Sequence, residues 1–360
     1  MQANRLPCNL PLVLPPGLGK GFRSMEKKRI GCFAIGLILL LCASVAFNFI
    51  FLIASSFKVD HLGAGAKAPK FEEATVVDAA GSSPDKIALI SLRGIISSSM
   101  DGTLGGSMVD DIKTALHQAS EDPKVKAVVL EVNSPGGEVT ASDVIYNAVR
   151  QVRDKSKKPV IVYMDSVAAS GGYYVACAGS HIIANETTLT GSIGVIIETL
   201  NYQQLMGKIG IDTVVFKSGK MKDMLSGSRT MTDQEKEYVQ GLVMETYDKF
   251  VGIVAAERKL PVEGLKSGIA DGRVLSGREA KKEKLIDSLG LIEDAYEMAK
   301  NLGHAPGAAI IRYESPFRLG KLFKLLGKAE PPKIELKLPQ ELTPRLQPGR
   351  LYLLPSFYVQ

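Results

Sequence analysis

The sequence has few of the residues that most often carry catalysis or bind metal. Its 360 residues include four histidines and four cysteines. No two cysteines have a CxxC spacing, no Cys/His spacing suggests zinc, and no disulfide framework is visible. Nothing close to Cys177 in sequence would lower its pKa, so we expect a small buried apolar residue rather than a nucleophile. The sequence therefore predicts neither a metal nor a cofactor.

The central part of the chain also has no excess of positive charge. The formal net charge is +6 at pH 7, but the excess basic residues lie in 1–29 and 312–360, and residues 30–311 are net negative. A protein that reads nucleic acid needs basic residues clustered on its folded body. The charge distribution therefore argues against a nucleic-acid partner.

An uncharged apolar stretch, residues 30–57, follows the basic cluster Lys27–Arg29. About 20 apolar residues span a bilayer as a helix, so this stretch is long enough for a transmembrane anchor. The alternative is a cleaved signal peptide with a small-residue site at Ser44–Ala46, although strong hydrophobicity continues to Ile53. The positive-inside rule predicts that residues 1–29 are cytoplasmic and that the chain after residue 57 is exported.

Composition divides the exported part into three regions. Residues 58–85 are rich in Gly, Ala, Pro and charged residues up to Asp85, which predicts a linker. Residues 86–311 contain the regular patterns of a folded domain. Residues 312–360 carry scattered basic residues among prolines, which predicts an extended or disordered tail. A final apolar patch, Leu351–Leu354, is suited to docking elsewhere.

Predicted strands and helices alternate in the folded domain. Apolar, β-branched runs predict strands at 86–94, 125–132, 159–164 and 181–184, and helical spacing predicts helices at 108–120, 141–153 and 173–178. This order predicts an α/β domain. A capping box at Thr232–Glu235 begins a long amphipathic helix that ends near Arg258. Its apolar face has no catalytic residue types, so we expect it to serve packing or subunit contact.

Two glycine-rich turns follow consecutive predicted strands. Pro135–Gly137 follows the strand at 125–132, and Ser170–Gly172 follows the strand at 159–164. Each turn alone is typical of an ordinary strand-to-helix connection. Adjacent strand ends, however, bring both turns to one edge of the sheet. A serine that begins a helix there can expose its hydroxyl beside backbone N–H groups that stabilise an oxyanion. Ser170 is therefore the candidate nucleophile.

The base that would activate Ser170 stays open from the residues alone. His181 is the histidine nearest in sequence, at the start of a predicted strand. A lysine can also remove the proton if it is held neutral. Lys217, Lys220 and Lys222 lie together downstream, and nothing in that segment favours one of them.

Five motifs in order resemble one known family. They are Val132–Gly137, Ala168–Tyr174, Leu189–Val195, Lys217–Asp223 and Ala270–Val274 with Leu285–Asp287. Over about residues 86–300 the chain resembles the signal peptide peptidase A (SppA) family in its short, single-repeat form. The resemblance implies a ClpP/crotonase-like α/β domain and a Ser-Lys dyad of Ser170 and Lys222. It also implies that Ser192 hydrogen-bonds the lysine amine and that the backbone of Gly137 and Gly171 forms the oxyanion hole.

The resemblance also implies a function and a setting. The protein would be a membrane-anchored serine endopeptidase of the bacterial inner membrane, with a periplasmic or extracellular catalytic domain. It would degrade membrane-released peptides such as remnant signal peptides, and it would form a homo-oligomeric ring in which neighbours complete the substrate groove. Because burial lowers a lysine pKa, we expect Lys222 to be buried near Ser170.

Three alternatives stay open beside this interpretation. An acyl-CoA enzyme of the same fold would use the paired N–H groups to hold a thioester oxyanion, and it would not need Ser170. A ClpP-like Ser-His-Asp protease is weakened by the shortage of histidine. A non-catalytic membrane-bound scaffold would oligomerise through the long helix.

Overall fold

The computed structural model describes residues 39–48, 71–99, 106–314 and 352–353. The chain divides into two units, Met1–Ala68 and Pro69–Gln360. In the first unit, residues 39–48 are helical. Within the described ranges, no helix is both long and apolar enough to cross a bilayer. The predicted anchor, 30–57, lies only partly within these ranges, and the predicted cytoplasmic segment, 1–29, lies outside them.

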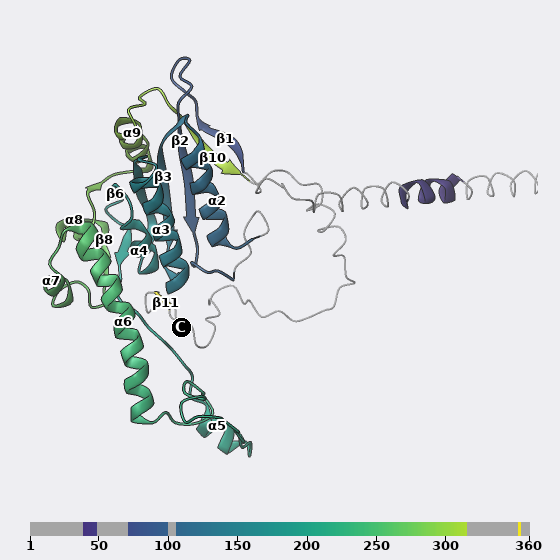
Figure 1. Ribbon diagram of the computed structural model, residues 1–360, viewed down its shortest axis with the longest axis vertical. Coiled ribbons are helices and arrows are strands. Elements are labelled where there is room, and N and C mark those ends of the chain that lie inside the picture. Colours follow the sequence, from purple (N-terminus) through teal and green to yellow (C-terminus); the bar gives the residue numbers. More distant parts are fainter. Residues whose placement is uncertain (1–38, 49–70, 100–105, 315–351, 354–360) are drawn as a thin grey trace, which may run out of the picture. The chain divides into compact units, whose positions relative to one another are not determined.

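The second unit is built on a nine-stranded sheet (Figure 1). Its main path runs β1 (Glu72–Val77), β10 (Ala309–Glu314), β2 (Lys86–Arg93), β3 (Val125–Ser134), β5 (Val160–Ala169), β6 (His181–Ala184) and β9 (Ser288–Leu289). In addition, β7 (Leu189–Gly191) pairs with β5 and with β8 (Val274–Ser276). The pairs are parallel except β1–β10 and β7–β8, which are antiparallel.

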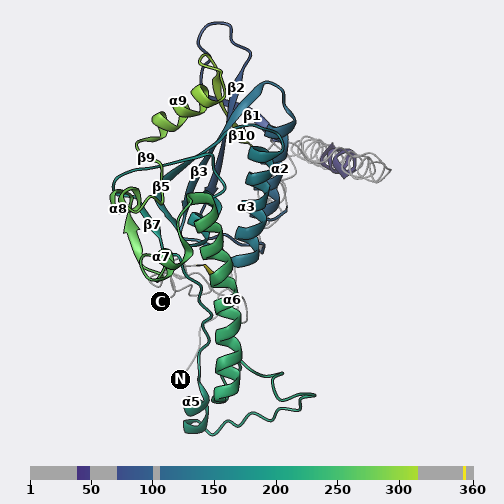
Figure 2. The ribbon, with the colours of Figure 1, turned by 60° about the vertical axis from the view of Figure 1, so that its left-hand side comes forward.

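Helices connect the parallel strands and cover the sheet (Figures 1 and 2). After β2, β3 and β5 come α2 (Met108–Glu121), α3 (Val139–Asp154) and α4 (Gly171–Ala176), and α9 (Ile292–Leu302) precedes β10. The remaining helices are α5 (Gln203–Lys208), α6 (Asp233–Arg258), α7 (Val262–Lys266) and α8 (Gly277–Lys282). The predicted alternation of strands and helices is therefore confirmed.

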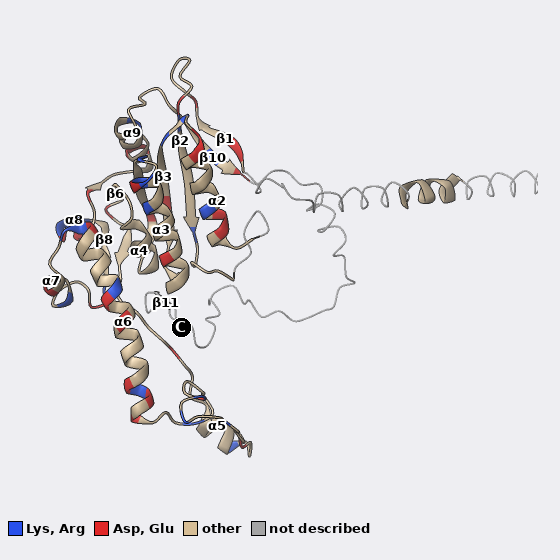
Figure 3. Cartoon of the chain, viewed as in Figure 1, with Lys and Arg blue, Asp and Glu red and all other residues tan. Residues whose placement is uncertain are grey.

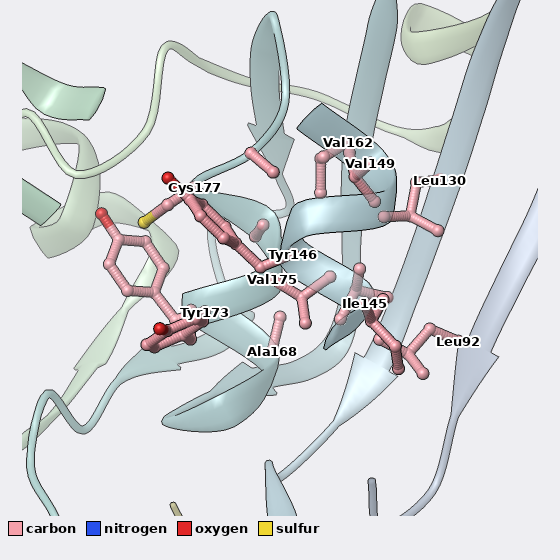
Figure 4. Close-up of a cluster of buried hydrophobic side chains, with 14 of the residues drawn as sticks. Leu92, Leu130, Ile145, Tyr146, Val149, Val162, Ala168, Tyr173, Val175 and Cys177 are labelled. Carbon is pink, nitrogen blue, oxygen red and sulfur yellow. The ribbon is translucent and has the colours of Figure 1, made fainter. Parts of the chain in front are cut away.

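Side chains of the central strands alternate between two apolar clusters. In β3, Val128, Leu130 and Val132 belong to the larger cluster, with residues of α2, α3 and α4. Ala127 and Val129 belong to the smaller cluster, with residues of α9. Figure 4 shows part of the larger cluster, with Leu130 close to the side chains of the helices. Burial on both faces explains why these strands read as nearly continuous apolar runs.

The long helix α6 begins at the predicted capping box and has two different halves. Phe250, Val251 and Val254, in its C-terminal half, are fully buried in the larger cluster. Its N-terminal half and residues 197–232 form what we call the arm (residues 197–245). With 26 residues, α6 is about 39 Å long. Figures 1 and 2 both show α5 at the end of α6 that is remote from the sheet.

The structure differs from two of the predicted regions. The predicted linker, 58–85, includes β1, an edge strand whose residues are mostly exposed and therefore show no alternation of apolar residues. The predicted tail, 312–360, begins inside β10 and includes β11 (Tyr352–Leu353), which pairs with β4 (Gly137–Glu138). Both β1 and β11 form through backbone hydrogen bonds, which require no particular pattern of side chains in the sequence.

Candidate active site

Ser170 lies at the corner between β5 and α4. Its backbone has φ 53° and ψ −116°. A residue with a side chain rarely occupies this region, and such strain costs about 1–3 kcal/mol. The Ser170 N–H donates a hydrogen bond of 2.8 Å to the Gly191 carbonyl, which ties the corner to β7. Backbone strain of this kind is concentrated at functional sites.

The Ser170 hydroxyl is buried and has no hydrogen-bond partner within the described residues. The whole residue has an exposed fraction of 0%. A buried hydroxyl without a partner costs about 1–3 kcal/mol. The corner therefore holds a polar group for which the described part of the chain supplies no partner.

The two glycine-rich turns meet beside Ser170, as predicted. A Cβ atom on Gly171 would lie 3.1 Å from the Gly137 nitrogen and 2.6 Å from Ser142 Oγ. A Cβ atom on Gly137 would lie 2.0 Å from the Ile96 carbonyl oxygen. Both positions therefore require glycine because the neighbouring chain segments approach too closely for a side chain. The first amides of α4 have no intrahelical acceptor and are available to an oxyanion.

The loop after β2 supports β4 in a way that sequence reasoning missed. The Ile96 N–H donates to the Gly136 carbonyl, and the Ile96 carbonyl accepts from the Glu138 N–H, both at 2.8 Å. The buried Glu138 carboxylate accepts hydrogen bonds of 2.7 Å from the hydroxyls of Ser97 and Ser98. No sequence signal marks this support, since one isoleucine and two serines are ordinary loop residues.

Ser192 lies next to Ser170 at the end of the neighbouring strand. The parallel pairing of β5 and β7 places Ala169 opposite Gly191, so the residues that follow are neighbours. Ser192 has φ 48°, is 3% exposed, and donates its N–H to the Arg273 carbonyl at 2.8 Å. Four of the five predicted site residues therefore gather at this edge of the sheet.

Lys222, the fifth, is not part of this cluster. Its side chain is exposed on the arm, and it does not contact Ser170 Oγ. The prediction that Lys222 is buried near Ser170 is therefore wrong for the single chain. The physical reason is that the chain after β7 follows α6 away from the sheet instead of returning to it, as Figure 2 shows.

An ion-pair network holds the loop that carries Lys222. The Asp223 carboxylate pairs with Arg229 at 2.7 Å and with Lys217 at 2.6 Å. Hydrogen bonds from Arg229 and Lys217 hold the pKa of Asp223 well below its usual range. Arg229 also pairs with the buried Glu235 in the first turn of α6. The Lys217 amine is thus paired with Asp223. The ion pairs of Lys217 and Asp223 also hold the backbone on both sides of Lys222.

The described histidines lie near the ends of the elements where the parallel strands begin, whereas Ser170 follows the end of β5. His181 begins β6 and pairs with Ile161, near the start of β5. The rest of β5 separates His181 from the Ser170 corner by about 26 Å, at about 3.3 Å per residue. His117 is in the last part of α2, which leads to the start of β3, and His304 follows α9 beside the start of β3. Burial also lowers the pKa of His181. None of these three is placed to activate Ser170 within one chain.

Cys177 is an apolar core residue, as expected. It lies beside Tyr173 in the larger cluster (Figure 4), and burial raises the pKa of its thiol to about 12. This raised pKa argues against a thiolate nucleophile there. In the described part of the chain, no group of three or more His, Cys, Asp or Glu side chains could hold a metal ion. Chemistry without a cofactor stays a prediction.

Comparison with known proteins assigns this chain to a family. Residues 152–305 match peptidase family S49, and residues 77–190 match Clp protease. A protein of Enterococcus faecium named as a signal peptide peptidase SppA is 37% identical over 238 residues, which cover 65% of this chain and 69% of the relative. The chain belongs to peptidase family S49. The resemblance to the SppA family is thereby confirmed.

Two further relatives agree with membership of family S49. A protease of Synechocystis sp. is 40% identical over 217 residues, covering 60% of this chain and 74% of the relative. Protease 4 of Salmonella typhi is 37% identical over 218 residues, covering 60% of this chain and 34% of the relative. As a member of family S49 the protein is a serine-type peptidase, and its sheet is consistent with a ClpP-like fold.

Proposed function

We propose that this protein is a membrane-anchored serine endopeptidase that uses a dyad of Ser170 and Lys222. Its substrates would be peptides released from the membrane, such as remnant signal peptides. The observation that carries the proposal is the buried Ser170 hydroxyl, which has no hydrogen-bond partner among the described residues and lies at a strained corner beside Gly137 and Gly171. Membership of family S49 supports peptidase chemistry, and the name of the Enterococcus relative supports the substrate class.

In this proposal Lys222 reaches Ser170 from a neighbouring copy of the chain. Lys222 is exposed on the arm, and Ser170 Oγ has no partner in its own described chain. The arm also exposes large apolar side chains, with Phe216 95% exposed. The others that are more than 45% exposed are Leu200, Tyr202, Leu205, Ile209, Ile211, Val214, Val215 and Tyr238. In Figure 3, α5 is almost entirely uncharged. Exposed apolar patches of this kind mark protein–protein contacts.

An arm that contacts the active site of the next copy forms a head-to-tail interface. Such interfaces generate rings when the rotation between copies closes. Each active site then takes its nucleophile from one copy and its base from the neighbour. Burial of Lys222 in this interface lowers its pKa, because desolvation disfavours the charged amine. Assembly would thus create the neutral base that Ser170 requires.

The proposed reaction is an acyl transfer to Ser170 followed by hydrolysis. The Lys222 amine accepts the Ser170 proton while Oγ forms a bond to the substrate carbonyl carbon. The N–H groups of Gly137 and Gly171 donate hydrogen bonds to the resulting oxyanion. The C–N bond then breaks as the ammonium returns the proton to the leaving amine. Water, deprotonated by the same amine, hydrolyses the ester. Ser192 would orient the amine by accepting one of its hydrogen bonds.

The proposed location depends on the sequence of the N-terminal region. The uncharged stretch 30–57 and the basic residues before it support a single-pass anchor with a cytoplasmic N-terminus. The catalytic unit would then lie in the periplasm or outside the cell. Peptides left in the membrane after export would reach it from that side.

Digestion of a synthetic signal peptide by the full chain in detergent tests the proposed function. We expect cleavage by the wild type and a loss of about 100-fold or more in kcat for Ser170→Ala and for Lys222→Ala. Lys220→Ala is the matched control, since it removes a lysine from the same loop, and it should retain most activity. Full activity of Lys222→Ala, with Ser170→Ala inactive, would show that the base is wrongly assigned. Activity of Ser170→Ala would refute the nucleophile.

A further inference from the structure

Asp143, near the start of α3, joins three helices through one carboxylate oxygen. Its Oδ1 atom accepts a hydrogen bond of 2.6 Å from the Tyr174 hydroxyl of α4. The same oxygen lies 2.8 Å from Nζ of Lys249 in α6. The Tyr174 ring also packs against the Phe250 ring of α6, with the ring centroids 5.1 Å apart. The helices α3, α4 and α6 therefore meet at Asp143.

Two of these helices adjoin the candidate active site, and the third leads to the arm. The helix α4 follows Ser170 directly, and the Tyr174 N–H donates to the Ser170 carbonyl at 2.8 Å. The helix α3 follows β4 directly. In α6, Lys249 precedes Phe250, the first fully buried residue of the C-terminal half. The N-terminal half of α6 extends away from the sheet (Figure 2). Asp143 therefore holds α6 close to where the arm begins.

The arm acts as a lever between Lys249 and Lys222. The loop that carries Lys222 is tied to the first turn of α6, because Arg229 pairs with both Asp223 and Glu235. From Lys249 back to its first residue, α6 measures about 24 Å at about 1.5 Å per residue. A tilt of about 2–3° at Lys249 therefore moves the start of α6 by about 1 Å. A misplacement of about 1 Å between reacting groups lowers a rate by up to about 100-fold.

We propose that Asp143 is a positioning residue, which fixes the direction of α6 and thereby sets where Lys222 meets Ser170 of the neighbouring copy. The inference rests on the proposed function, in which these two residues come from different copies. The Asp143–Lys249 ion pair adds little to stability, since the Lys249 side chain is 54% exposed. Its contribution is to the geometry of the arm. Loss of the pair should therefore change activity far more than it changes Tm.

Hydrolysis of the synthetic signal peptide by the full chain in detergent gives the first test. Asp143→Asn keeps an acceptor for the Tyr174 hydroxyl but removes the charge that holds Lys249. We expect kcat to fall about tenfold and KM to change less than about threefold, because the contact positions the base and not the peptide. The Tm should stay within about 2 °C of the wild type. A kcat that falls only in proportion to a large loss of Tm would show a structural role and refute the inference.

Three further variants test whether the ion pair is the cause. Lys249→Met should lower kcat as Asp143→Asn does, and the double variant should lose no more than either single variant, because both remove the same contact. Lys249→Arg keeps the positive charge and should retain activity. Asp154→Asn is the matched control, since it removes from the same helix a carboxylate that is paired with Arg153 and not with α6. That control should leave kcat unchanged.

Cross-linking between copies measures the position of Lys222 without catalysis. One full chain carries Lys222→Cys and the other Ser170→Cys, and in both the three cysteines before residue 43 are changed to alanine. The two chains are co-expressed, and a short bismaleimide links the new cysteines. Asp143→Asn in the chain with Lys222→Cys should slow linking about fivefold, because it releases the arm that presents the cysteine. The same substitution in the chain with Ser170→Cys should not, since the arm of that chain does not supply the linked cysteine.

The two measurements separate this inference from the proposed function. Linking that is slowed by Asp143→Asn in the arm chain, without any hydrolysis by the wild type, would uphold the inference and refute the proposed function. Hydrolysis with a kcat and a linking rate that Asp143→Asn leaves unchanged would refute the inference alone. Slower linking only when the substitution is in the Ser170→Cys chain would also refute it, because Asp143 would then act on its own active site. No linking of any pair would refute the contact between copies on which both rest.

Discussion

Replacing Ser170 by alanine should stabilise the fold while it abolishes hydrolysis. The hydroxyl is buried without a hydrogen-bond partner within the described residues, an arrangement that costs about 1–3 kcal/mol. Alanine keeps the Cβ atom and removes only the oxygen, so it opens no sizeable cavity. The strain of φ 53° stays, because alanine has the same backbone preference. We therefore expect a gain of about 1 kcal/mol in the free energy of unfolding. For a unit of this size that gain raises Tm by about 2–4 °C.

Thermal unfolding followed by circular dichroism measures this gain. The comparison is made in a Lys222→Ala background, so that no neighbouring amine can hydrogen-bond the hydroxyl. Ser134→Ala is the control, since Ser134 is equally buried but its hydroxyl accepts a hydrogen bond of 3.0 Å from the Gly136 N–H. That variant should lose about 1–2 kcal/mol because it leaves a buried N–H unpaired. If Ser170→Ala lowers Tm as much as Ser134→Ala does, the Ser170 hydroxyl is hydrogen-bonded in the folded protein and the predicted stabilisation is refuted.

Three further predictions concern the assembled site and the arm. Chains carrying Ser170→Ala and chains carrying Lys222→Ala, co-expressed in equal amounts, should recover about a quarter of wild-type peptidase activity. The reason is that one neighbour pair in four joins an intact Ser170 to an intact Lys222. A complete lack of recovery would place the dyad within one copy. Gly171→Ala should lower kcat about 100-fold and change KM less than threefold, because the added Cβ crowds the Gly137 nitrogen, the other proposed oxyanion donor. A change in KM alone in steady-state kinetics would contradict that role. Hydrogen bonds, the largest from Arg229, lower the pKa of Glu235 to about 2. The ionised carboxylate therefore stabilises the arm fully at any pH above the pKa that Glu235 has in the unfolded chain. This stabilisation is lost as the pH falls from that value through about 2. Limited proteolysis of the arm should therefore be no faster at pH 5 than at pH 7 in the wild type, and Arg229→Met should be cut faster than the wild type at both pH values.

Much of the fold and part of the site could be predicted from the residues. The strands β2, β3, β5 and β6 are buried on both faces or nearly so, and each shows as an apolar, β-branched run. Their ends share one edge, because consecutive parallel strands joined by helices point the same way. The nearness of Ser170, Gly137 and Gly171 followed from that geometry. The role predicted for Ser192 came only from the family resemblance. Its place beside Ser170 came from the pairing of β7 with β5.

The position of Lys222 could not be predicted in the same way. The segment that carries it contains no buried strand, and its path is set by the contacts of the arm with itself. The local sequence preferences of such a loop are the same whether it folds back onto the sheet or away from it. The strand β11 was equally hidden, since two residues that pair through their backbone have no pattern of their own.

Residue types and their spacing were enough to specify the α/β domain and a candidate nucleophile, because burial and turn geometry act on residues close together in the chain, and the five ordered motifs indicated the family. The exposure of Lys222, the Ser170 hydroxyl without a partner among the described residues, and the pairing of β11 with β4 emerged only in the folded molecule. Each of these depends on contacts, made or missing, between segments far apart in sequence. Such contacts are selected by the packing of the whole chain rather than by any local preference.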